Sequence, residues 1–348
     1  MNILVTGANG QLGQCLKWIV EANKNGERDH YVGDKNCYIF KSREELDISN
    51  LEEVRKTVKQ EFINVIVNCA AYTNVNKAQE EKELTHLVNN VGAMNLAIAA
   101  SETGAVLIHI STDYVFSVEN KVNTPLPPFN FSDPFKEIKY KSVKMEDNYY
   151  GFSKLNAEDA IIRSNCKYII LRTSWLYSWF GKNFVKTMFD KIVNGENIKV
   201  VYDQVGSPTS AHELAKFIYH IIEKHGPNTR YLSKCGIYNF VENGVASWYD
   251  IVEHIKTYLQ EYCELQVDAT VTPCLSDEFK QPVKRPNYSV LDNHLTKETF
   301  NYDIKYWEKS LNRVIYHLWM EYIENEKPSE KVKKSLNNLI NAIFEKTK

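Results

Sequence analysis

Short apolar runs alternate with segments of helical periodicity along most of the chain. Runs with the length and residue types of buried strands occupy residues 2–6, 37–40, 64–73, 105–110, 168–172 and 237–240. Apolar residues at helical spacing follow several of them, at 12–20, 84–102 and 211–224, and further helices are expected to begin near residues 50, 150, 183 and 247. This alternation predicts an α/β fold, a Rossmann-type doubly wound parallel sheet with helices on both faces.

The first strand runs directly into a glycine-rich turn. The turn reads Gly7-Ala8-Asn9-Gly10-Gln11-Leu12-Gly13, with G-x-x-G-x-x-G spacing in place of G-x-G-x-x-G. A strand, a glycine turn and a helix in this order are typical of a dinucleotide site, where the pyrophosphate lies at the positive end of the helix. A strand–turn–helix unit without a ligand is the alternative.

The end of the second strand bears on the choice between NADPH and NADH. A site that prefers NAD usually carries an acidic residue there, to bind the ribose 2′-hydroxyl. This chain has Lys41-Ser42-Arg43, which suits a 2′-phosphate, although Arg43 could simply be solvated. The sequence therefore favours NADPH, with NADH possible.

Tyr150 and Lys154 stand four residues apart in the first turns of a predicted helix, so their side chains share one face. An ammonium beside a phenol stabilises the phenolate and is expected to lower the pKa of Tyr150 from about 10. Such a tyrosine can protonate a ketone oxygen or deprotonate an alcohol. An exposed helical Tyr–Lys pair without a function fits the same spacing.

Thr112 follows the apolar run 105–110, where its hydroxyl could hold a carbonyl oxygen beside Tyr150. A strand-end threonine or a helix N-cap is the structural alternative. Because the carboxyl ends of parallel strands meet at one edge, Gly7, Ala71, Thr112 and the loop before Tyr150 are expected to converge there.

Composition excludes several classes of function. The chain has 348 residues, 43% of them hydrophobic and 25% charged, and a net charge of −2 from 42 basic and 44 acidic side chains. This balance does not favour a nucleic-acid or membrane surface, and no apolar run approaches 18 residues. Seven scattered cysteines without Cys-x-x-Cys spacing predict reduced thiols and no zinc site. We therefore expect a cytoplasmic protein without a signal sequence.

Several motifs, in order, carry a family resemblance. They are the glycine turn, Asn68-Cys69-Ala70-Ala71-Tyr72-Thr73, Ser111-Thr112-Asp113-Tyr114-Val115-Phe116, Tyr150-x3-Lys154, Arg172-Thr173-Ser174-Trp175-Leu176-Tyr177, Gly181-Lys182-Asn183-Phe184, Asp203-Gln204-Val205-Gly206-Ser207-Pro208-Thr209 and Arg285-Pro286-x2-Ser289-x-Leu291-Asp292. With these, the chain resembles the extended short-chain dehydrogenase/reductases and, among them, the dTDP-4-dehydrorhamnose reductase family.

The resemblance implies an NAD(P)H-dependent oxidoreductase that reduces the C4 ketone of dTDP-4-dehydro-β-L-rhamnose. It also implies two domains. Residues 1–176, with 209–240 returning to them, would form the NAD(P)-binding Rossmann domain. Residues 177–208 and 241–320 would form a smaller mixed α/β substrate-binding domain, and 321–348 an extra C-terminal helix.

The resemblance also implies roles for individual residues. Tyr150 would be the proton donor, Lys154 would bind the nicotinamide ribose, Thr112 would polarise the carbonyl, and Asp113 would tune this group. The implied cofactor-binding residues are Gly7, Gly10, Gln11, Leu12, Gly13, Asp47, Ile48, Ala70, Ala71, Tyr72, Thr73, Tyr150 and Lys154. The implied substrate-binding residues are Thr112, Asp113, Trp175 and Asn183, with a core aromatic at a domain seam as the alternative for Trp175.

The chain also departs from the family pattern. Some members bridge a dimer through magnesium held by acidic side chains, one of them in the first helix, where this chain has Cys15; no metal is therefore expected. Asn76 and Ser117 replace usual aspartates, and the 117–147 loop, a possible lid, is longer than usual. A helix at about 329–346 is expected to dock on the body or on a partner.

Other assignments remain open. One is a different nucleotide-sugar reductase or epimerase of the same fold, and another is a non-catalytic regulatory subunit or an NADP-sensing scaffold. The intact set of Thr112, Tyr150 and Lys154 favours an enzyme. The sequence leaves the choice between a monomer and a homodimer undecided.

Overall fold

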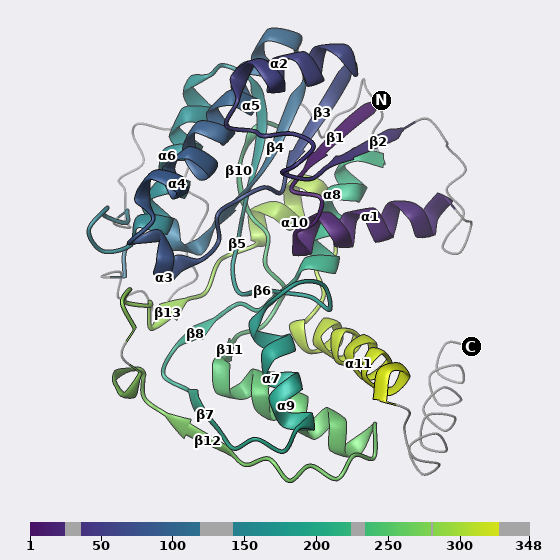
Figure 1. Cartoon of the computed structure of the whole chain (residues 1–348), viewed down its shortest axis with the longest axis vertical. Helices are drawn as coiled ribbons and strands as arrows, with labels where there is room; N and C mark the ends of the chain where they lie inside the picture. The colour runs from purple at the N-terminus through teal and green to yellow at the C-terminus, as the bar shows by residue number, and fades with distance from the viewer. Residues whose placement is uncertain (25–35, 119–141, 224–233, 280, 327–348) are drawn as a thin grey trace.

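The computed structural model describes residues 1–24, 36–118, 142–223, 234–279 and 281–326 (Figure 1). The predicted loops at 22–36 and 117–147 lie largely outside these ranges, and so does the helix expected at 329–346. None of the helices within the described ranges combines the length and the apolar character needed to cross a lipid bilayer.

A six-stranded parallel sheet forms the larger part of the molecule. Its strands are β1 (Asn2–Thr6), β2 (Cys37–Lys41), β3 (Ile63–Asn68), β4 (Val106–Thr112), β5 (Lys167–Thr173) and β10 (Gly236–Asn239). Their order is β10-β5-β4-β3-β1-β2, and every neighbouring pair is parallel. The strand order reverses beside β1, so the carboxyl ends of β1 and β3 flank the crevice in which such sheets bind ligands.

Side chains of successive strand residues point to opposite faces, and helices cover both faces (Figure 1). Ile3 and Val5 pack toward α1 (Gln11–Lys24) and α8 (Ala211–Glu223). Leu4 packs on the other face, where α2 (Leu51–Gln60), α5 (Gly92–Thr103) and α6 (Tyr149–Arg163) lie. The predicted doubly wound α/β class is confirmed.

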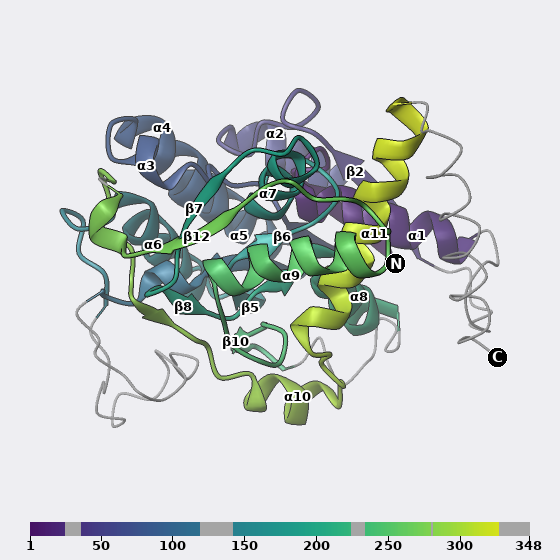
Figure 2. The ribbon, with the colours of Figure 1, turned by 90° about the horizontal axis from the view of Figure 1, so that it is seen from below.

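A smaller lobe packs below the carboxyl ends of the strands (Figures 1 and 2). Its helices α7 (Phe184–Val193), α9 (Trp248–Glu261) and α11 (Trp307–Glu326) share one hydrophobic core, with Phe189, Ile255 and Leu311 buried in it. Its short strands are β6 (Leu176–Tyr177), β7 (Ile198–Val201), β8 (Val205–Gly206), β9 (Thr209–Ser210), β11 (Ala246–Ser247), β12 (Val271–Cys274) and β13 (Tyr288–Ser289). The remaining elements are α3 (Val75–Ala78), α4 (Lys82–His86), the π-helix η1 (Leu87–Val91), the 3₁₀ helices η2 (Asp113–Val115) and η3 (Ser276–Glu278), and α10 (His294–Phe300).

Two expected elements differ in the structure, and one helix was not expected. The run at 64–73 leaves the sheet after Asn68, because Cys69, Ala70, Ala71 and Thr73 line a cavity instead of pairing. The helix expected at 84–102 contains a π-helical turn over Leu87–Val91. α11 was not predicted, and the expected boundary at residue 321 lies inside it.

Candidate active site

A cavity of about 890 Å³ opens where the carboxyl ends of β1, β3, β4 and β5 face the smaller lobe. Its walls come from the glycine turn, from the segments that follow β3 and β4, from the start of α6, and from α7 and α9. This is the position at which a doubly wound sheet binds its ligands. The convergence predicted for Ala71, Thr112 and Tyr150 is found, since all three line this cavity.

The glycine turn opens α1 toward the cavity. Gly7 has φ +66°, and a Cβ there would lie 2.6 Å from the amide nitrogen of Ala70, so only glycine fits without strain. A Cβ on Gly13 would collide with the carbonyl of Gly7, and this close contact seats α1 against β1. Gly10, Gln11 and Leu12 line the cavity at the helix N-terminus. Unpaired backbone N–H groups at a helix N-terminus are suited to a pyrophosphate.

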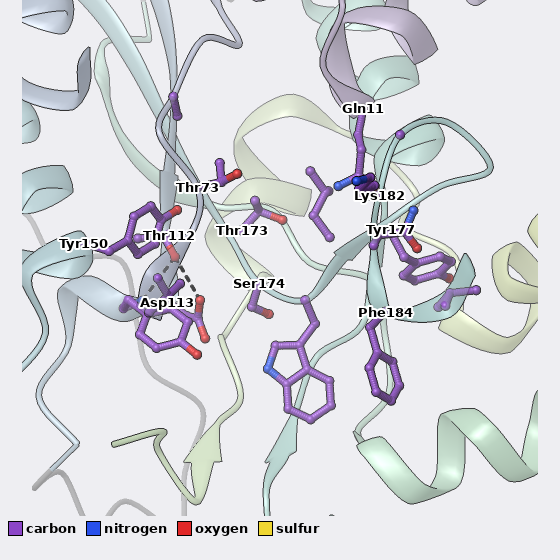
Figure 3. Close-up of a pocket in the computed structure, with 18 of the residues that line it drawn as sticks. Gln11, Thr73, Thr112, Asp113, Tyr150, Thr173, Ser174, Tyr177, Lys182 and Phe184 are labelled. Atoms are coloured by element: carbon purple, nitrogen blue, oxygen red, sulfur yellow. Dashed lines mark hydrogen bonds between the residues drawn. The ribbon is translucent and has the colours of Figure 1, made fainter. Parts of the chain in front are cut away.

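The polar wall of the cavity consists of Thr112, Asp113, Tyr150 and Lys154. Thr112 ends β4, and its hydroxyl donates to Asp113 Oδ1 at 3.0 Å. Tyr150 belongs to the first turn of α6, whose N-cap Asn148 accepts from the backbone N–H of Gly151 at 3.0 Å. A Cβ on Gly151 would collide with the carbonyl of Tyr114, so the glycine allows α6 to approach η2. Figure 3 shows Tyr150, Thr112 and Asp113 together on one side of the cavity.

Burial shifts the pKa of each titratable group on this wall. The pKa of Tyr150 is raised by burial, and a hydrogen bond with Thr112 opposes the shift. Burial also raises the pKa of Asp113 to about 7, against smaller opposing effects of Thr112, Ser289 and Arg285. The same effect lowers the pKa of Lys154 to about 8, because desolvation disfavours its ammonium form.

The expectation that Lys154 lowers the pKa of Tyr150 is wrong for this structure. Lys154 Nζ donates to the carbonyl of Ile110 at 2.6 Å and lies 3.1 Å from His109 Nε2, so it is turned toward β4. Desolvation of the phenol outweighs the opposing effects of the Thr112 hydrogen bond and of Arg285, and the pKa of Tyr150 rises. Tyr150 therefore keeps its proton at neutral pH.

A buried ion pair fixes α6 against the sheet. Arg172 Nε on β5 donates to Glu158 on α6 at 2.9 Å, and both side chains are almost completely buried. Ser111, at the end of β4, donates to the same carboxylate. Glu158 lies one turn beyond Lys154, so this contact positions the helix that carries Tyr150 and Lys154.

The opposite side of the cavity is aromatic. Trp175 and Trp248 are stacked, with ring centroids 3.6 Å apart and an interplanar angle of 6°. Phe184 packs on Trp248 with a centroid distance of 4.5 Å. Trp175 has φ +47°, a strained conformation for a bulky residue, and its indole lies against Gly206, where a Cβ would be 2.6 Å from the ring. We call Trp175, Trp248 and Phe184 the aromatic wall.

The structure brings many predicted site residues to the cavity, but not all of them. Those that line it are Gly10, Gln11, Leu12, Ala70, Ala71, Thr73, Thr112, Asp113, Tyr150, Lys154, Trp175 and Asn183. Gly7 and Gly13 shape the turn instead, and Asp47 binds the Ser49 backbone N–H at 3.0 Å. Ile48 packs against Gly92, and the Tyr72 hydroxyl donates to Glu81 at 2.6 Å.

Asn183 has a structural role as well as a place in the cavity. Its Oδ1 accepts from the backbone N–H of Lys186 at 3.1 Å and caps α7, while Nδ2 donates to the Ser178 carbonyl at 2.7 Å. These bonds occupy most of its polar groups, so its assignment to the substrate stays a prediction.

Several cavity residues were missed at the level of sequence, among them Trp248 and Arg285. Trp248 was placed only at the start of a helix, and its distance along the chain from Trp175 gave no sign of the stack. Arg285 was quoted as part of a motif without a role. In the structure it donates to the Tyr114 hydroxyl at 2.7 Å and to Asn76 Oδ1 at 3.0 Å. An arginine next to proline in a loop was the available signal.

The charged residues that line the cavity are mostly basic. Among the described residues, the charged side chains that line the cavity are Lys154, Lys182, Lys199 and Arg285, with Asp113 as the one acidic group. Figure 3 shows Lys182 beside Gln11, near the start of α1. Such a lining favours an anionic ligand. Within the described residues, no group of three or more His, Cys, Asp or Glu side chains could hold a metal ion, and Cys15 is buried.

Comparisons with known proteins agree with this geometry. The family model for the RmlD substrate binding domain matches residues 1–320. A dTDP-4-dehydrorhamnose reductase from Aggregatibacter actinomycetemcomitans is 33% identical over 317 residues, which cover 90% of this chain and 97% of the relative.

Two crystal structures of proteins described as dTDP-4-dehydrorhamnose reductases are also similar. The protein from Clostridium acetobutylicum has a TM-score of 0.76 and 35% identity, with 92% of this chain and 100% of that chain covered. The protein from Bacillus anthracis, crystallised with NADP, has a TM-score of 0.76 and 31% identity, with 91% and 99% covered. The resemblance inferred from the motifs is confirmed. Because the family model matches residues 1–320, this chain belongs to the RmlD substrate binding domain family.

Proposed function

We propose that this protein reduces the C4 ketone of dTDP-4-dehydro-β-L-rhamnose to dTDP-L-rhamnose with NADPH, or with NADH as a weaker alternative. One observation carries the proposal: a protonated Tyr150, hydrogen-bonded with Thr112, lines the same cavity as the open N-terminus of α1. This arrangement places a proton donor and a dinucleotide site in one enclosure. The identity of the proposed substrate is inferred from the relatives named dTDP-4-dehydrorhamnose reductase.

The residues present fit a nicotinamide dinucleotide. The glycine turn exposes backbone N–H groups at α1, where Gly10, Gln11 and Leu12 would hold the pyrophosphate. Ala70, Ala71 and Thr73 would border the cofactor, and Lys154 would bind the nicotinamide ribose. Lys41 and Arg43, at the end of β2, would favour the 2′-phosphate of NADPH. The bound cofactor supplies the hydride.

Tyr150 acts as the acid in the proposed reaction. Its raised pKa keeps the phenol protonated at neutral pH, which is the form needed to give a proton to a ketone oxygen during reduction. The Thr112 hydroxyl donates its one proton to Asp113 in this structure. In the proposed complex it would turn from Asp113 and donate to the ketone oxygen beside the phenol.

The two remaining parts of the cavity suit the rest of a nucleotide sugar. Lys182, Lys199 and Arg285 can bind a diphosphate, and the aromatic wall offers a flat apolar surface for a base or a sugar ring. Trp175 would contact the substrate. Asn183 is proposed to contact it as well, although its side-chain amide already makes hydrogen bonds with Ser178 and Lys186.

The proposal extends to the organisation of the protein. The Rossmann part, residues 1–176 with 209–240, would bind the cofactor, and the smaller lobe would bind the nucleotide sugar. We further propose a cytoplasmic enzyme that works as a monomer or a homodimer without a metal ion.

The test is oxidation of NADPH and of NADH with the dTDP-4-keto sugar generated in situ, and with the corresponding GDP-keto sugar as a control. We expect turnover with the dTDP sugar only, and faster turnover with NADPH. Turnover with the GDP sugar instead would assign a different nucleotide-sugar reductase. Tight cofactor binding without turnover of either sugar would contradict the proposal and favour a regulatory subunit.

A further inference from the structure

A chain of buried polar groups leads from β1 to Lys154. The Thr6 hydroxyl donates to Asn68 Oδ1 at 2.7 Å, and Asn68 Nδ2 lies 3.0 Å from His109 Nδ1. His109 Nε2 in turn lies 3.1 Å from Lys154 Nζ. Asn68 and His109 are register partners on β3 and β4, and all four side chains are at most 2% exposed. These side chains are therefore almost completely withdrawn from the molecular surface.

The orientation of the Asn68 amide is fixed by the backbone. The N–H of Ala70, which can only donate, lies 3.1 Å from Asn68 Oδ1. An exchanged amide would set two donors against each other there, so the oxygen must face Ala70 and the NH₂ group must face His109. The Asn68 NH₂ group then donates to His109 Nδ1, which is left without a proton. A neutral imidazole in this setting carries its proton on Nε2.

This tautomer has a consequence for Lys154. The His109 Nε2–H points at Lys154 Nζ, and an ammonium group has no lone pair to accept it. A neutral amine can accept from Nε2 and still donate to the Ile110 carbonyl at 2.6 Å. All hydrogen bonds from Thr6 through Asn68 and His109 to Lys154 are satisfied only when Lys154 is a neutral amine.

We propose that Asn68 and His109 form a tautomer lock, in which Asn68 holds the imidazole proton on Nε2 and this N–H disfavours the ammonium form of Lys154. His109 is thus a positioning residue that acts through Lys154, and its effect on catalysis rests on the proposed function. Asn68, His109 and Lys154 are called the lock residues below.

Other titratable and charged groups near Lys154 also influence how readily it takes up a proton. Glu158, on the same helix, favours the ammonium, but its carboxylate is already paired with Arg172 on β5. Tyr150 on α6 keeps its proton, and Asp113 on η2 titrates near 7, so it adds negative charge above that pH. The lock is the contact that opposes the ammonium from β4. Burial and, to a smaller extent, the ammonium form of Lys154 lower the pKa of His109 well below its usual value, so the imidazole is neutral.

The protonation state of Lys154 matters for the proposed reaction. The ammonium is the form that binds a ribose hydroxyl as a donor and stabilises the Tyr150 phenolate left after proton transfer. Since the pKa of Lys154 is about 8, turnover is expected to fall as the pH rises above this value. After Tyr150 has given its proton to the ketone oxygen, a lysine held near its pKa can give a proton to the phenolate that is left, and the resulting amine then takes up a proton from solvent.

The first experiment needs no substrate, and the His109→Leu variant identifies the His109 signal among the nine histidines of the protein. In wild-type protein labelled with ¹⁵N-histidine, long-range ¹H–¹⁵N spectra distinguish a protonated from an unprotonated ring nitrogen. We expect His109 to be neutral near pH 7, with its proton on Nε2. A proton on Nδ1, or on both nitrogens, overturns the lock.

The second experiment reverses the lock with a nearly isosteric change. In Asn68→Asp the carboxylate can still accept hydrogen bonds from Thr6 and Ala70. It can also accept a hydrogen bond from His109 when the imidazole carries its proton on Nδ1. Nε2 then faces Lys154 with a lone pair and favours the ammonium. We expect the alkaline limb of kcat/KM against pH to move upward by about one unit or more.

A double-mutant cycle separates the tautomer from the added charge. The Asn68→Asp change is repeated in a His109→Leu background, where no imidazole transmits the effect. We expect the shift of the alkaline limb to be mostly lost there. An equal shift in both backgrounds would mean that charge alone acts and would contradict the lock. Absence of turnover with the dTDP sugar would refute the proposed function, while the ¹⁵N spectra would still decide the tautomer.

Discussion

The polar wall and the aromatic wall of the cavity are built in different ways. Thr112, Tyr150 and Lys154 lie at the ends of β4 and at the start of α6, which are parts of the large parallel sheet and its helices. Trp175 and Trp248 come from a loop and a helix far apart in the sequence, and they meet only through the packing of the smaller lobe. One wall therefore depends on secondary structure and the other on tertiary contacts.

This difference indicates a division of labour. The polar wall holds groups whose pKa values are shifted by burial, which is typical of groups that exchange protons. The aromatic wall has no such group and offers surface area and shape. We expect changes in the polar wall to affect the chemical step, and changes in the aromatic wall to affect substrate binding.

The largest effect is expected for Tyr150→Phe. Loss of the phenol removes the proposed acid, so turnover should fall by about two to four orders of magnitude while cofactor binding is retained. Steady-state kinetics and cofactor titration measure the two quantities. Tyr149→Phe is the matched control, because Tyr149 packs near Phe152 and Lys82, and it should turn over like the wild type. A large loss in the control alone would move the proton donor to Tyr149.

The next effect concerns the support of the polar wall. Glu158→Gln leaves the buried guanidinium of Arg172 without its carboxylate, and we expect the free energy of unfolding to fall by about 3–5 kcal/mol. Urea unfolding measures it. Asp159→Asn, in an exposed pair with Arg163, should cost less than about 1 kcal/mol. Equal losses in the two variants would show that the buried pair does not anchor α6.

A smaller, pH-dependent effect is expected for Asp113→Asn. Burial raises the pKa of Asp113 to about 7 in the folded state, above the value of about 3.9 in an unfolded chain. Between these values only the folded state holds the proton, so the contribution of Asp113 to stability is present at low pH and is lost as the pH rises toward 7. Because asparagine does not titrate, the stability of the variant does not fall in this way as the pH rises. Relative to the wild type, it should gain about 1–4 kcal/mol between about pH 4 and pH 8.

Urea unfolding at the two pH values tests this expectation. The asparagine still offers Oδ1 to the Thr112 hydroxyl, so a constant offset from other contacts cancels in the comparison. A difference between variant and wild type that does not change with pH would contradict the raised pKa of Asp113.

The smallest effect is expected in the aromatic wall. Trp248→Ala removes the stack with Trp175, and an aromatic pair contributes about 0.5–1.5 kcal/mol beyond its buried area. We expect KM for the dTDP sugar to rise about 2- to 10-fold, with little change in kcat. Trp248→Phe is the matched control and should restore most of the affinity. A loss of kcat with an unchanged KM would remove the proposed division between the walls.

Much of the sheet could be predicted from the sequence. The apolar runs gave β1, β2, β4, β5 and β10 to within about two residues, because a strand buried on both faces needs a continuous apolar run. A helix near residue 50 was predicted from a cap at Ser49 or Asn50. In the structure α2 begins at Leu51, and Asn50 is its cap and accepts from the Glu53 backbone N–H. By contrast, α11 was missed, and the run after Asn68 was taken for a longer strand.

The candidate site divides in the same manner. Sequence alone determined the glycine turn, the Tyr150–Lys154 spacing and the place of Thr112 just after the apolar run 105–110, because each is a local relation within one turn or near one strand end. Only the tertiary structure decided the Trp175–Trp248 stack, the contact of His109 with Lys154 and the desolvation that sets the pKa values of Asp113 and Tyr150. Local spacing follows from the geometry of one element. Burial and contacts between distant segments depend on how all the elements pack together.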